Sequence, residues 1–395
     1  MTTFSELPLS AALQQRLAAA KFITPTPVQE QAIPPALAGQ DLIATAQTGT
    51  GKTLAFLIPV IESLQQSTAR NIEALVLVPT RELAVQVHEH FELLRGPKLK
   101  PAALVIGGFA EKKQIQAIRS GARLVVATPG RLEDYLRRGL IDLQQVHKVI
   151  LDEADRMLDM GFLPAIRRIL GGIPQSRQTL CFSATLEQSV AALVHQYLRN
   201  PVRVALGSTL KPCESVELQA FELATTQKPD VLRQLLSAEK GRTLVFARTK
   251  RGTERLAKQL ARDGFATAMI HGDRTQAQRT EALSSFEAGR IKVLIATDLA
   301  ARGLHVQDIM HVINYDLPNL PEDFIHRVGR TGRAGALGLA STLVSGAEVS
   351  ELRSIERALQ LRMTRKEIGP GILASKSCNT LDSRTLKAMP GEIFA

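Results

Sequence analysis

The stretch Ala46-Gln47-Thr48-Gly49-Thr50-Gly51-Lys52-Thr53 decides how this chain folds. It follows an apolar run at residues 41–45, which predicts a buried strand, and a helical pattern begins near Lys52. Gly49 and Gly51 lack the Cβ that would keep backbone N–H groups away from a polyphosphate. The stretch therefore predicts a phosphate-binding loop between a strand and a helix.

Several residues of this loop have a predicted role in nucleotide binding. The helix N-terminus contributes partial positive charge, Lys52 reaches the terminal phosphates, and the Thr53 hydroxyl is a ligand for Mg²⁺. The remaining predicted contacts come from Thr48, Gly49, Thr50 and Gly51. The general pattern begins with glycine, and Ala46 stands in that place. The alternative is a flexible surface turn, which the flanking strand and helix disfavour.

Length and charge indicate the size of the protein and the kind of partner. A chain of 395 residues predicts two or three domains. Its net charge of +11 favours a polyanionic partner. Aromatic residues are only 4% of the chain and Trp is absent, so we expect nucleic acid to be held by its backbone and not by base stacking.

The cysteines and apolar segments predict a protein of the reducing cytoplasm, and we expect it to be monomeric. Cys181, Cys213 and Cys378 have no zinc-type spacing, and nothing in their placement suggests a disulfide framework. The first residues lack a signal-peptide layout, and no apolar run approaches membrane-spanning length. We therefore expect no membrane partner.

Short apolar runs alternate with helical patterns in the first half of the chain. The predicted strands are residues 73–78, 102–106, 123–127, 148–151 and 179–182, with helices at 10–20, 82–94 and 110–120 among them. This alternation predicts an α/β fold with a parallel sheet covered by helices on both faces. Polar motifs follow these strands, where ligands of such sheets bind.

A second α/β series follows a break in the pattern. Residues 207–215 predict a linker, and further strands are predicted at 243–247, 266–270, 292–295, 310–314 and 339–344. A helical pattern covers 347–361, and we expect the tail at 369–395 to be loosely ordered. The predicted domains are therefore residues 1–206 and 216–368.

An acidic cluster at the end of the strand at 148–151 supplies the second half of a nucleotide site. Asp152 can hold Mg²⁺ through water, and Glu153 is the candidate general base for the water that attacks the γ-phosphate. The alternative is a solvated acidic turn that caps the next helix. The position about 100 residues after Lys52, in an alternating α/β pattern, favours the catalytic interpretation.

Two further segments complete the predicted nucleotide site. In the segment 2–30, Phe22 offers a flat face to a base and Gln29 offers a donor and an acceptor to adenine, although a turn with a helix-starting Gln is the alternative. Near the end of the chain, Arg330 and Arg333 stand three apart, which we interpret as one helical face pointing at one anion. A solvated basic turn is the alternative there.

These motifs together resemble a DEAD-box RNA helicase of superfamily 2, of the bacterial type with a short C-terminal tail. The resemblance runs from about residue 4 to about residue 361 and rests on motifs in the family's order: 22 with 25–29, 46–53, 79–84, 107–108, 128–131, the literal Asp-Glu-Ala-Asp at 152–155, 183–185, 244–249, 271–273, 276 with 279, 296–303 and 326–333. The family shares the alanine at Ala46. The resemblance implies two RecA-like domains in tandem, joined by a flexible linker.

The resemblance also implies an activity and the residues that perform it. It implies ATP and Mg²⁺ as cofactors, RNA-stimulated ATP hydrolysis, and local, non-processive unwinding of short RNA duplexes. It implies that His326, Asp155, Ser183 and Thr185 couple hydrolysis to RNA binding. The implied RNA contacts are Arg81, Gly108, Thr128, Arg131, Gly272, Arg279 and Thr297. These groups suit phosphate and 2′-OH contacts, so we expect binding without sequence preference.

The sequence departs from the family pattern at His305, where an aspartate normally accepts hydrogen bonds from the ATP ribose. Neutral imidazole offers one acceptor, so either the substitution is tolerated or closure on nucleotide is weakened and pH-sensitive. Two other functions stay open: an ATP-gated RNA clamp that does not unwind, and a DNA-translocating helicase, which the resemblance disfavours.

Overall fold

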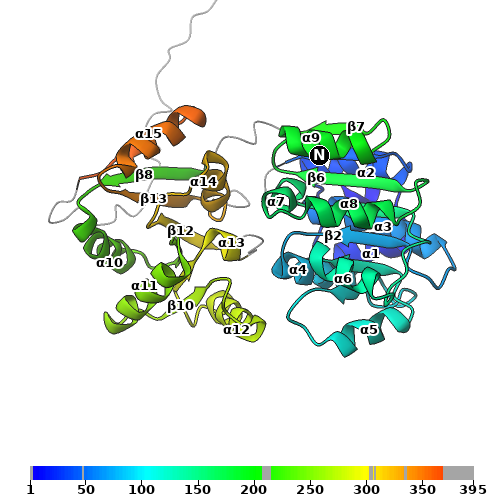
Figure 1. Ribbon diagram of the computed structural model, residues 1–395. Coiled ribbons are helices and arrows are strands. Elements are labelled where there is room, and N and C mark those ends of the chain that lie inside the picture. The colour runs from blue at the N-terminus through cyan, green and yellow to red at the C-terminus, as the bar shows by residue number, and fades with distance from the viewer. Residues whose placement is uncertain are drawn as a thin grey trace, which may run out of the picture.

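The computed structural model describes residues 3–46, 49–206, 215–301, 306, 308–332 and 336–367. The described strands form two parallel sheets of seven strands, one in residues 42–205 and one in residues 216–365 (Figure 1). We call the parts of the chain that carry them the first and second lobes. The predicted α/β fold with two parallel-sheet domains in tandem is confirmed. Residues 207–214 of the predicted linker and all of the predicted tail lie outside the described residues.

The first sheet has the strand order β3-β4-β2-β5-β6-β1-β7. Its strands are β1 (Leu42–Thr45), β2 (Ala74–Leu77), β3 (Ala103–Val105), β4 (Leu124–Ala127), β5 (Lys148–Leu151), β6 (Gln178–Ser183) and β7 (Val202–Ala205). The helices of this lobe are α1 (Ala11–Ala19), α2 (Pro27–Leu37), α3 (Lys52–Gln66), α4 (Arg81–Leu94), α5 (Glu111–Arg119), α6 (Pro129–Arg137), α7 (Ala154–Asp159), α8 (Leu163–Gly171) and α9 (Gln188–Tyr197).

The second sheet has the order β10-β11-β9-β12-β13-β8-β14. Its strands are β8 (Val216–Glu222), β9 (Arg242–Phe246), β10 (Thr267–Ile270), β11 (Val293–Ala296), β12 (Ile309–Asn314), β13 (Gly338–Val344) and β14 (Thr364–Arg365). The helices are α10 (Lys228–Ala238), α11 (Lys250–Arg262), α12 (Gln276–Glu287), α13 (Asp298–Ala301), α14 (Pro321–Val328) and α15 (Glu348–Ala358). No described helix has the length and apolar character needed to cross a bilayer.

The strands are apolar at successive positions because each sheet is buried on both faces. In β2, Val76 packs into the core under α1 to α4, while Leu75 and Leu77 pack into the core under α6, α8 and α9. In the second lobe, Leu244 and Val245 of β9 likewise enter opposite cores. Alternation of side chains across a pleated strand therefore turns an uninterrupted apolar run into two separate cores.

Three strands were not indicated by the sequence patterns. β7 pairs with β1, β8 pairs with β13, and β14 pairs with β8. β7 and β14 each lie at one edge of their sheet, and β8 mixes exposed and buried residues. A strand that needs no continuous apolar run gives little sequence signal, so these three were missed.

The second sheet buries a histidine in a neutral form. The side chain of His311 on β12 is almost fully buried, and Nε2 lies 2.8 Å from the Ser341 hydroxyl on β13. Burial lowers the pKa of His311 to about 3, because an imidazolium would lose its hydration there.

The lowered pKa of His311 predicts acid sensitivity of the fold. A histidine in the unfolded chain titrates near pH 6.5, so below this pH the unfolded state binds a proton that the folded state does not. The free energy of unfolding therefore falls as the pH falls toward 3, and at pH 5 it is lower by about 2 kcal/mol than at neutral pH. We expect His311→Gln to reduce this acid slope, measured as the denaturation midpoint between pH 5 and 8. His195→Gln, at an exposed site, is the control. An unchanged slope in His311→Gln would contradict the assignment.

Candidate active site

Three neighbouring strand ends build the centre of the first lobe. β5, β6 and β1 are adjacent in the sheet, so their carboxyl ends lie side by side. Ala46 N–H, after β1, donates to the carbonyl of Ser183 at the end of β6 (3.1 Å). The Asp155 carboxylate, after β5, accepts from the backbone N–H groups of Ala184 (3.0 Å) and Thr185 (3.1 Å). These bonds join the phosphate loop, the acidic cluster and the residues after β6 into one unit.

The phosphate loop uses glycine where the sequence predicts a need for it. Gly49 and Gly51 have φ of +87° and +93°, in the left-handed region that side chains disfavour. A Cβ at Gly51 would also lie 2.3 Å from Nε2 of Gln29. That Nε2 donates to the Gly51 carbonyl (2.9 Å), while Oε1 accepts from Thr26 N–H (2.9 Å). Gln29 therefore ties the predicted adenine segment to the loop and keeps one hydrogen and one lone pair for a base.

The other predicted nucleotide residues of the first lobe lie around this loop. Phe22 packs, partly buried, against the first-lobe core. Lys52 and Thr53 are the first two residues of α3, as the helical pattern predicts. Lys52 is buried, and its ammonium donates to the Ala46 carbonyl (2.9 Å), so it lies over the loop. Thr48 lies outside the described residues.

Asp152 is a buried carboxylate whose charge needs compensation. Burial raises its pKa to about 7, the neighbouring Lys52 ammonium opposes this rise, and Glu153 adds to it. A divalent cation beside Asp152 and the Thr53 hydroxyl would offset the cost of burying these negative charges, and both are oxygen ligands that Mg²⁺ accepts. The residues present therefore fit a Mg²⁺ ion.

Glu153 has a strained backbone at the start of α7. Its φ and ψ are both 51°, a left-handed conformation that costs an L-residue roughly 1–2 kcal/mol. The residue is buried. Single residues held in this way cluster at functional sites, because the surrounding fold must enforce them.

Arg330 of the second lobe lies across from Glu153, but not on a helix. α14 ends at Val328 and Gly329 is its C-cap, so Arg330 lies in the following turn and the predicted helical position of Arg330 is wrong. Arg330 is buried, and its Nε donates to the His326 carbonyl (3.2 Å). Burial lowers the pKa of Arg330, while the Glu153 carboxylate raises it. Arg333 and His305 lie outside the described residues.

The neighbouring Arg327 has a different place, inside its own lobe. Its guanidinium donates to both carboxylate oxygens of Asp298 (2.5 and 2.7 Å) and to the Asn314 side chain (3.1 Å), and it lies over the Phe246 ring. An arginine with a bidentate carboxylate partner and a stacked ring has a rigidly fixed guanidinium group. Arg327 therefore positions the turn that carries Arg330.

A groove of about 470 Å³ runs between the lobes and is lined from both. Five of the seven predicted RNA contacts line it: Arg81, Thr128, Arg131, Gly272 and Arg279. Gly108 lies beside it, since a Cβ there would be 2.5 Å from Nη1 of Arg81, and its φ of +80° requires glycine. Thr297 is buried and does not line the groove, although Leu299 two residues later does.

The groove concentrates positive charge. Burial lowers the pKa of Arg81, and the neighbouring Arg279 and Arg131 lower it further. Arg279 pairs with Glu82 (2.9 Å), and Arg131 lies 3.4 Å from Asp134. Three arginines that repel one another would be stabilised by a polyanion, whose phosphates can replace the carboxylate partners.

Side chains that the sequence reasoning missed connect the two lobes directly. The Arg156 guanidinium donates to the Asp323 carboxylate (2.7 Å), and both side chains are buried. Glu82 accepts from Gln276 (3.2 Å) as well as pairing with Arg279. Arg156 and Asp323 are 167 residues apart, and no local pattern signals such a pair; the one available hint was that Arg156 directly follows the acidic motif. His326 lines the same junction.

The fold and site define a two-lobed helicase. Residues 26–193 match the DEAD/DEAH box helicase model, and residues 227–335 match the helicase conserved C-terminal domain. The chain belongs to the DEAD-box ATP-dependent RNA helicases, which are RNA-dependent ATPases. The predicted family and enzyme class are thus confirmed.

Relatives and solved structures cover most of the chain. CshA of Geobacillus kaustophilus, a DEAD-box ATP-dependent RNA helicase, is 40% identical over 366 residues, which are 92% of this chain and 78% of that protein. CshA of Bacillus subtilis is 41% identical over 364 residues, 92% of this chain and 74% of that protein. The structure of S. cerevisiae Dbp5 bound to RNA and ADP BeF3 has a TM-score of 0.85 at 32% identity, covering 93% of this chain and 96% of that chain.

The Arg156–Asp323 pair predicts that closure of the lobes depends on a buried ion pair. We expect Arg156→Met and Asp323→Leu each to raise the RNA concentration for half-maximal ATPase about tenfold or more, since each leaves a buried charge. The loss of apparent RNA affinity in the double variant should be smaller than the sum of the losses in the two single variants, which a double-mutant cycle measures. The control is Arg168→Met, which removes an exposed pair with Glu133 within the first lobe. Strict additivity would show that the pair does not couple the lobes.

Proposed function

We propose that this protein couples RNA-stimulated ATP hydrolysis to local, non-processive unwinding or remodelling of short RNA duplexes. The observation that carries the proposal is the groove lined by Arg81 and Arg131 from one lobe and Arg279 from the other. A strand bound there touches both lobes at once, so RNA binding favours the closed arrangement. The Dbp5 structure bound to RNA and ADP BeF3 supports the same use of this fold.

The chemistry of the groove favours binding to the RNA backbone. Guanidinium groups, the Thr128 hydroxyl and glycine backbone amides match phosphates and 2′-hydroxyls, which carry no sequence information. Phe162 is the one aromatic residue among the described lining residues, so the groove has no series of stacking platforms. A bound strand forced to follow both lobes no longer fits a duplex, which separates its partner locally.

The nucleotide site divides the work of hydrolysis between the lobes. The first lobe binds the triphosphate through its loop and Lys52, while Thr53 and Asp152 would hold Mg²⁺. That ion supplies charge neutralisation at the phosphate oxygens. Glu153 accepts the proton of the attacking water. The Gln29 side chain has a donor and an acceptor left for adenine, and Phe22 is the proposed contact to the ring face of the base.

The second lobe supplies the groups that make hydrolysis depend on closure. Arg330 lies near Glu153, and with Arg333 it is proposed to stabilise the charge that develops on the γ-phosphate. Such arginines contribute a factor of about 10³–10⁵ in rate. Asp155, Ser183, Thr185 and His326 are proposed to relay closure to this site, since Asp155 bonds the backbone of Thr185 and His326 lines the junction. The monomeric state and cytoplasmic location stay predictions.

The proposed roles of Glu153 and Lys52 separate binding from turnover. Glu153→Gln should leave ATP binding intact and lower kcat by about 10²-fold or more, because the amide cannot accept the proton. Lys52→Ala should lose nucleotide binding or turnover. Single-turnover hydrolysis and equilibrium binding of a fluorescent ATP analogue measure the two steps. Wild-type turnover in Glu153→Gln would show that another group is the base.

The groove between the lobes predicts which nucleic acid stimulates the enzyme. Arg279→Ala should weaken RNA stimulation of the ATPase at least tenfold without changing basal hydrolysis, because it removes a second-lobe phosphate contact and the pair with Glu82. Strand separation of a short duplex with a single-stranded overhang tests unwinding. Hydrolysis without separation would favour the ATP-gated clamp, and equal stimulation by DNA would favour a DNA helicase.

His305 predicts a sensitivity to pH in nucleotide binding. If the imidazole replaces a ribose-binding carboxylate poorly, His305→Asp lowers the KM for ATP several-fold and removes its dependence on pH near the ordinary histidine pKa of about 6.5. Steady-state ATPase from pH 6 to 8 measures this. An identical KM in both proteins across that range would mean that the substitution is tolerated.

A further inference from the structure

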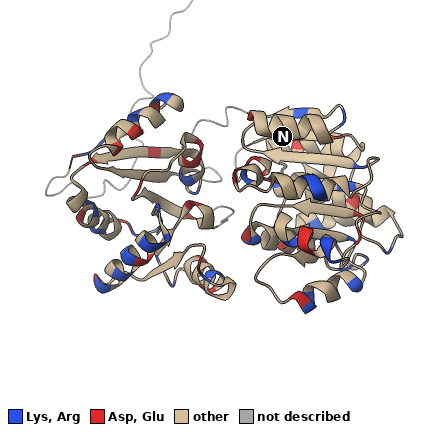
Figure 2. Ribbon diagram, viewed as in Figure 1, with Lys and Arg blue, Asp and Glu red and all other residues tan. Residues whose placement is uncertain are grey.

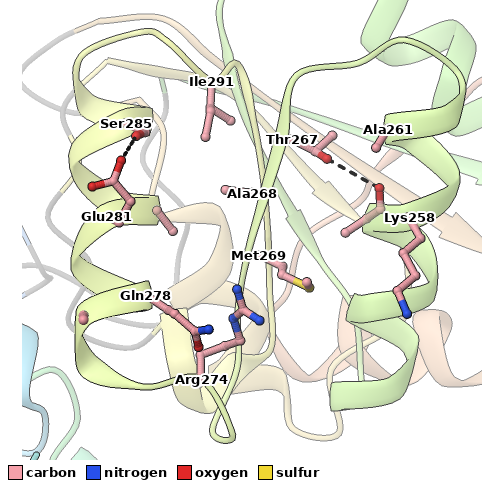
Figure 3. A pocket seen from close by; sticks show the side chains of 13 residues that line it. Lys258, Ala261, Thr267, Ala268, Met269, Arg274, Gln278, Glu281, Ser285 and Ile291 are labelled. Atoms are coloured by element: carbon pink, nitrogen blue, oxygen red, sulfur yellow. Dashed lines mark hydrogen bonds between the residues drawn. The ribbon is translucent and has the colours of Figure 1, made fainter.

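A groove separate from the nucleotide site lies along the outer edge of the second sheet. β10 is the edge strand there, and α11 and α12 flank it on the two faces of the sheet (Figure 3). The groove between them has a volume of about 580 Å³. Among the residues that the structure describes, none of the predicted nucleotide or RNA contacts lines it.

The backbone of β10 presents hydrogen-bonding groups to this groove. The Ala266 and Ile270 carbonyls accept from Val293 N–H (3.4 Å) and Thr297 N–H (3.3 Å) on the side of β11. In a parallel pair, the N–H and C=O of one residue point to the same neighbour and those of the next residue point away. The backbone groups of Thr267 and Met269 therefore face the open edge, where β10 has no second strand among the described residues.

The floor and walls of the groove are mostly apolar. Ala268 and Met269 of β10, Ala261 of α11 and Ala282 of α12 line it, together with Ile291. The small side chains on the helices leave room beside the strand, where a second backbone can approach. The Thr267 hydroxyl is already used, since it donates to the Ala257 carbonyl (3.4 Å).

The rim of the groove is positive. Lys258 and Arg274 line it, and neither side chain has a hydrogen bond or an ion pair to any other described residue. Arg274 extends between the helices toward Met269 (Figure 3). The one carboxylate among the described lining residues, Glu281, accepts from the Ser285 hydroxyl (3.0 Å). Lys and Arg also gather along α11 (Figure 2), where the exposed basic residues are Lys250, Arg251, Arg255, Lys258 and Arg262.

We propose that this groove binds an extended acidic peptide of a partner protein, which adds to β10 as a further strand. The peptide backbone pairs with the outward groups of Thr267 and Met269, alternate apolar side chains fill the groove, and its carboxylates pair with Lys258 and Arg274. Charge complementarity selects the acidic partner. RNA fits less well, because an apolar floor offers nothing to phosphates.

A peptide that alternates Glu or Asp with Val or Leu over about eight residues, capped at both ends, tests the proposal on the full-length protein. Its binding is measured by fluorescence anisotropy. We expect Arg274→Glu to weaken binding about tenfold, with Lys240→Glu, an exposed lysine outside the groove, as the matched control without effect. ATP turnover should stay unchanged in both variants, because neither Arg274 nor Lys240 is a predicted nucleotide contact or lines the groove between the lobes.

A second peptide keeps the test independent of how the variants fold. The same sequence, N-methylated at alternate residues that face β10, cannot donate to the strand edge, and we expect it to bind at least tenfold more weakly. Equal binding of the two peptides, or no binding at millimolar concentration, would overturn strand addition. If a single-stranded RNA displaces the peptide, the groove is a nucleic-acid surface and the proposal is wrong. If deletion of residues 368–395 raises affinity more than tenfold, the occupant is the chain's own tail instead.

Discussion

The burial of adjacent carboxylates at the end of β5 is the constraint on which the rest of the structure depends. Asp152 and Glu153 are both almost inaccessible to water, and burial is the main reason that the pKa of Asp152 is raised to about 7. Buried negative charge is costly unless cations surround it. Lys52 supplies one cation from the same lobe, and Arg330 supplies another from the second lobe. Charge compensation therefore gives the two lobes a physical reason to meet at this point.

The same balance of charge operates in the groove between the lobes. Arg81, Arg131 and Arg279 lie near one another, and carboxylates such as Glu82 and Asp134 neutralise them in part. A nucleic-acid backbone is a better partner for such a cluster than scattered carboxylates are. In the proposed function, closure of the lobes brings together arginines for two polyanions, and each ligand stabilises the arrangement that the other needs.

Rigid side-chain contacts inside each lobe fix the segments that face the other lobe. Asp155 holds the backbone after β6 in the first lobe, and Arg327 holds the turn before Arg330 by its bidentate contact with Asp298. Neither side chain needs to touch a ligand. Each fixes a segment for which ligand contact is proposed, so one short motif contains residues with a structural role beside residues with a proposed catalytic role.

The sequence by itself determined the α/β class, most strands, the phosphate loop with its glycines and the position of the acidic cluster, because these depend on local periodicity and on φ angles that glycine alone adopts readily. Only the tertiary structure decided that β7, β8 and β14 join the sheets, that Arg330 lies in a turn beyond α14, and that Arg156 meets Asp323. β7, β8 and β14 lack a continuous buried apolar run, and contacts across 167 residues leave no local pattern. Local sequence sets which groups end each strand, whereas the packing of whole lobes sets which of those groups face one another.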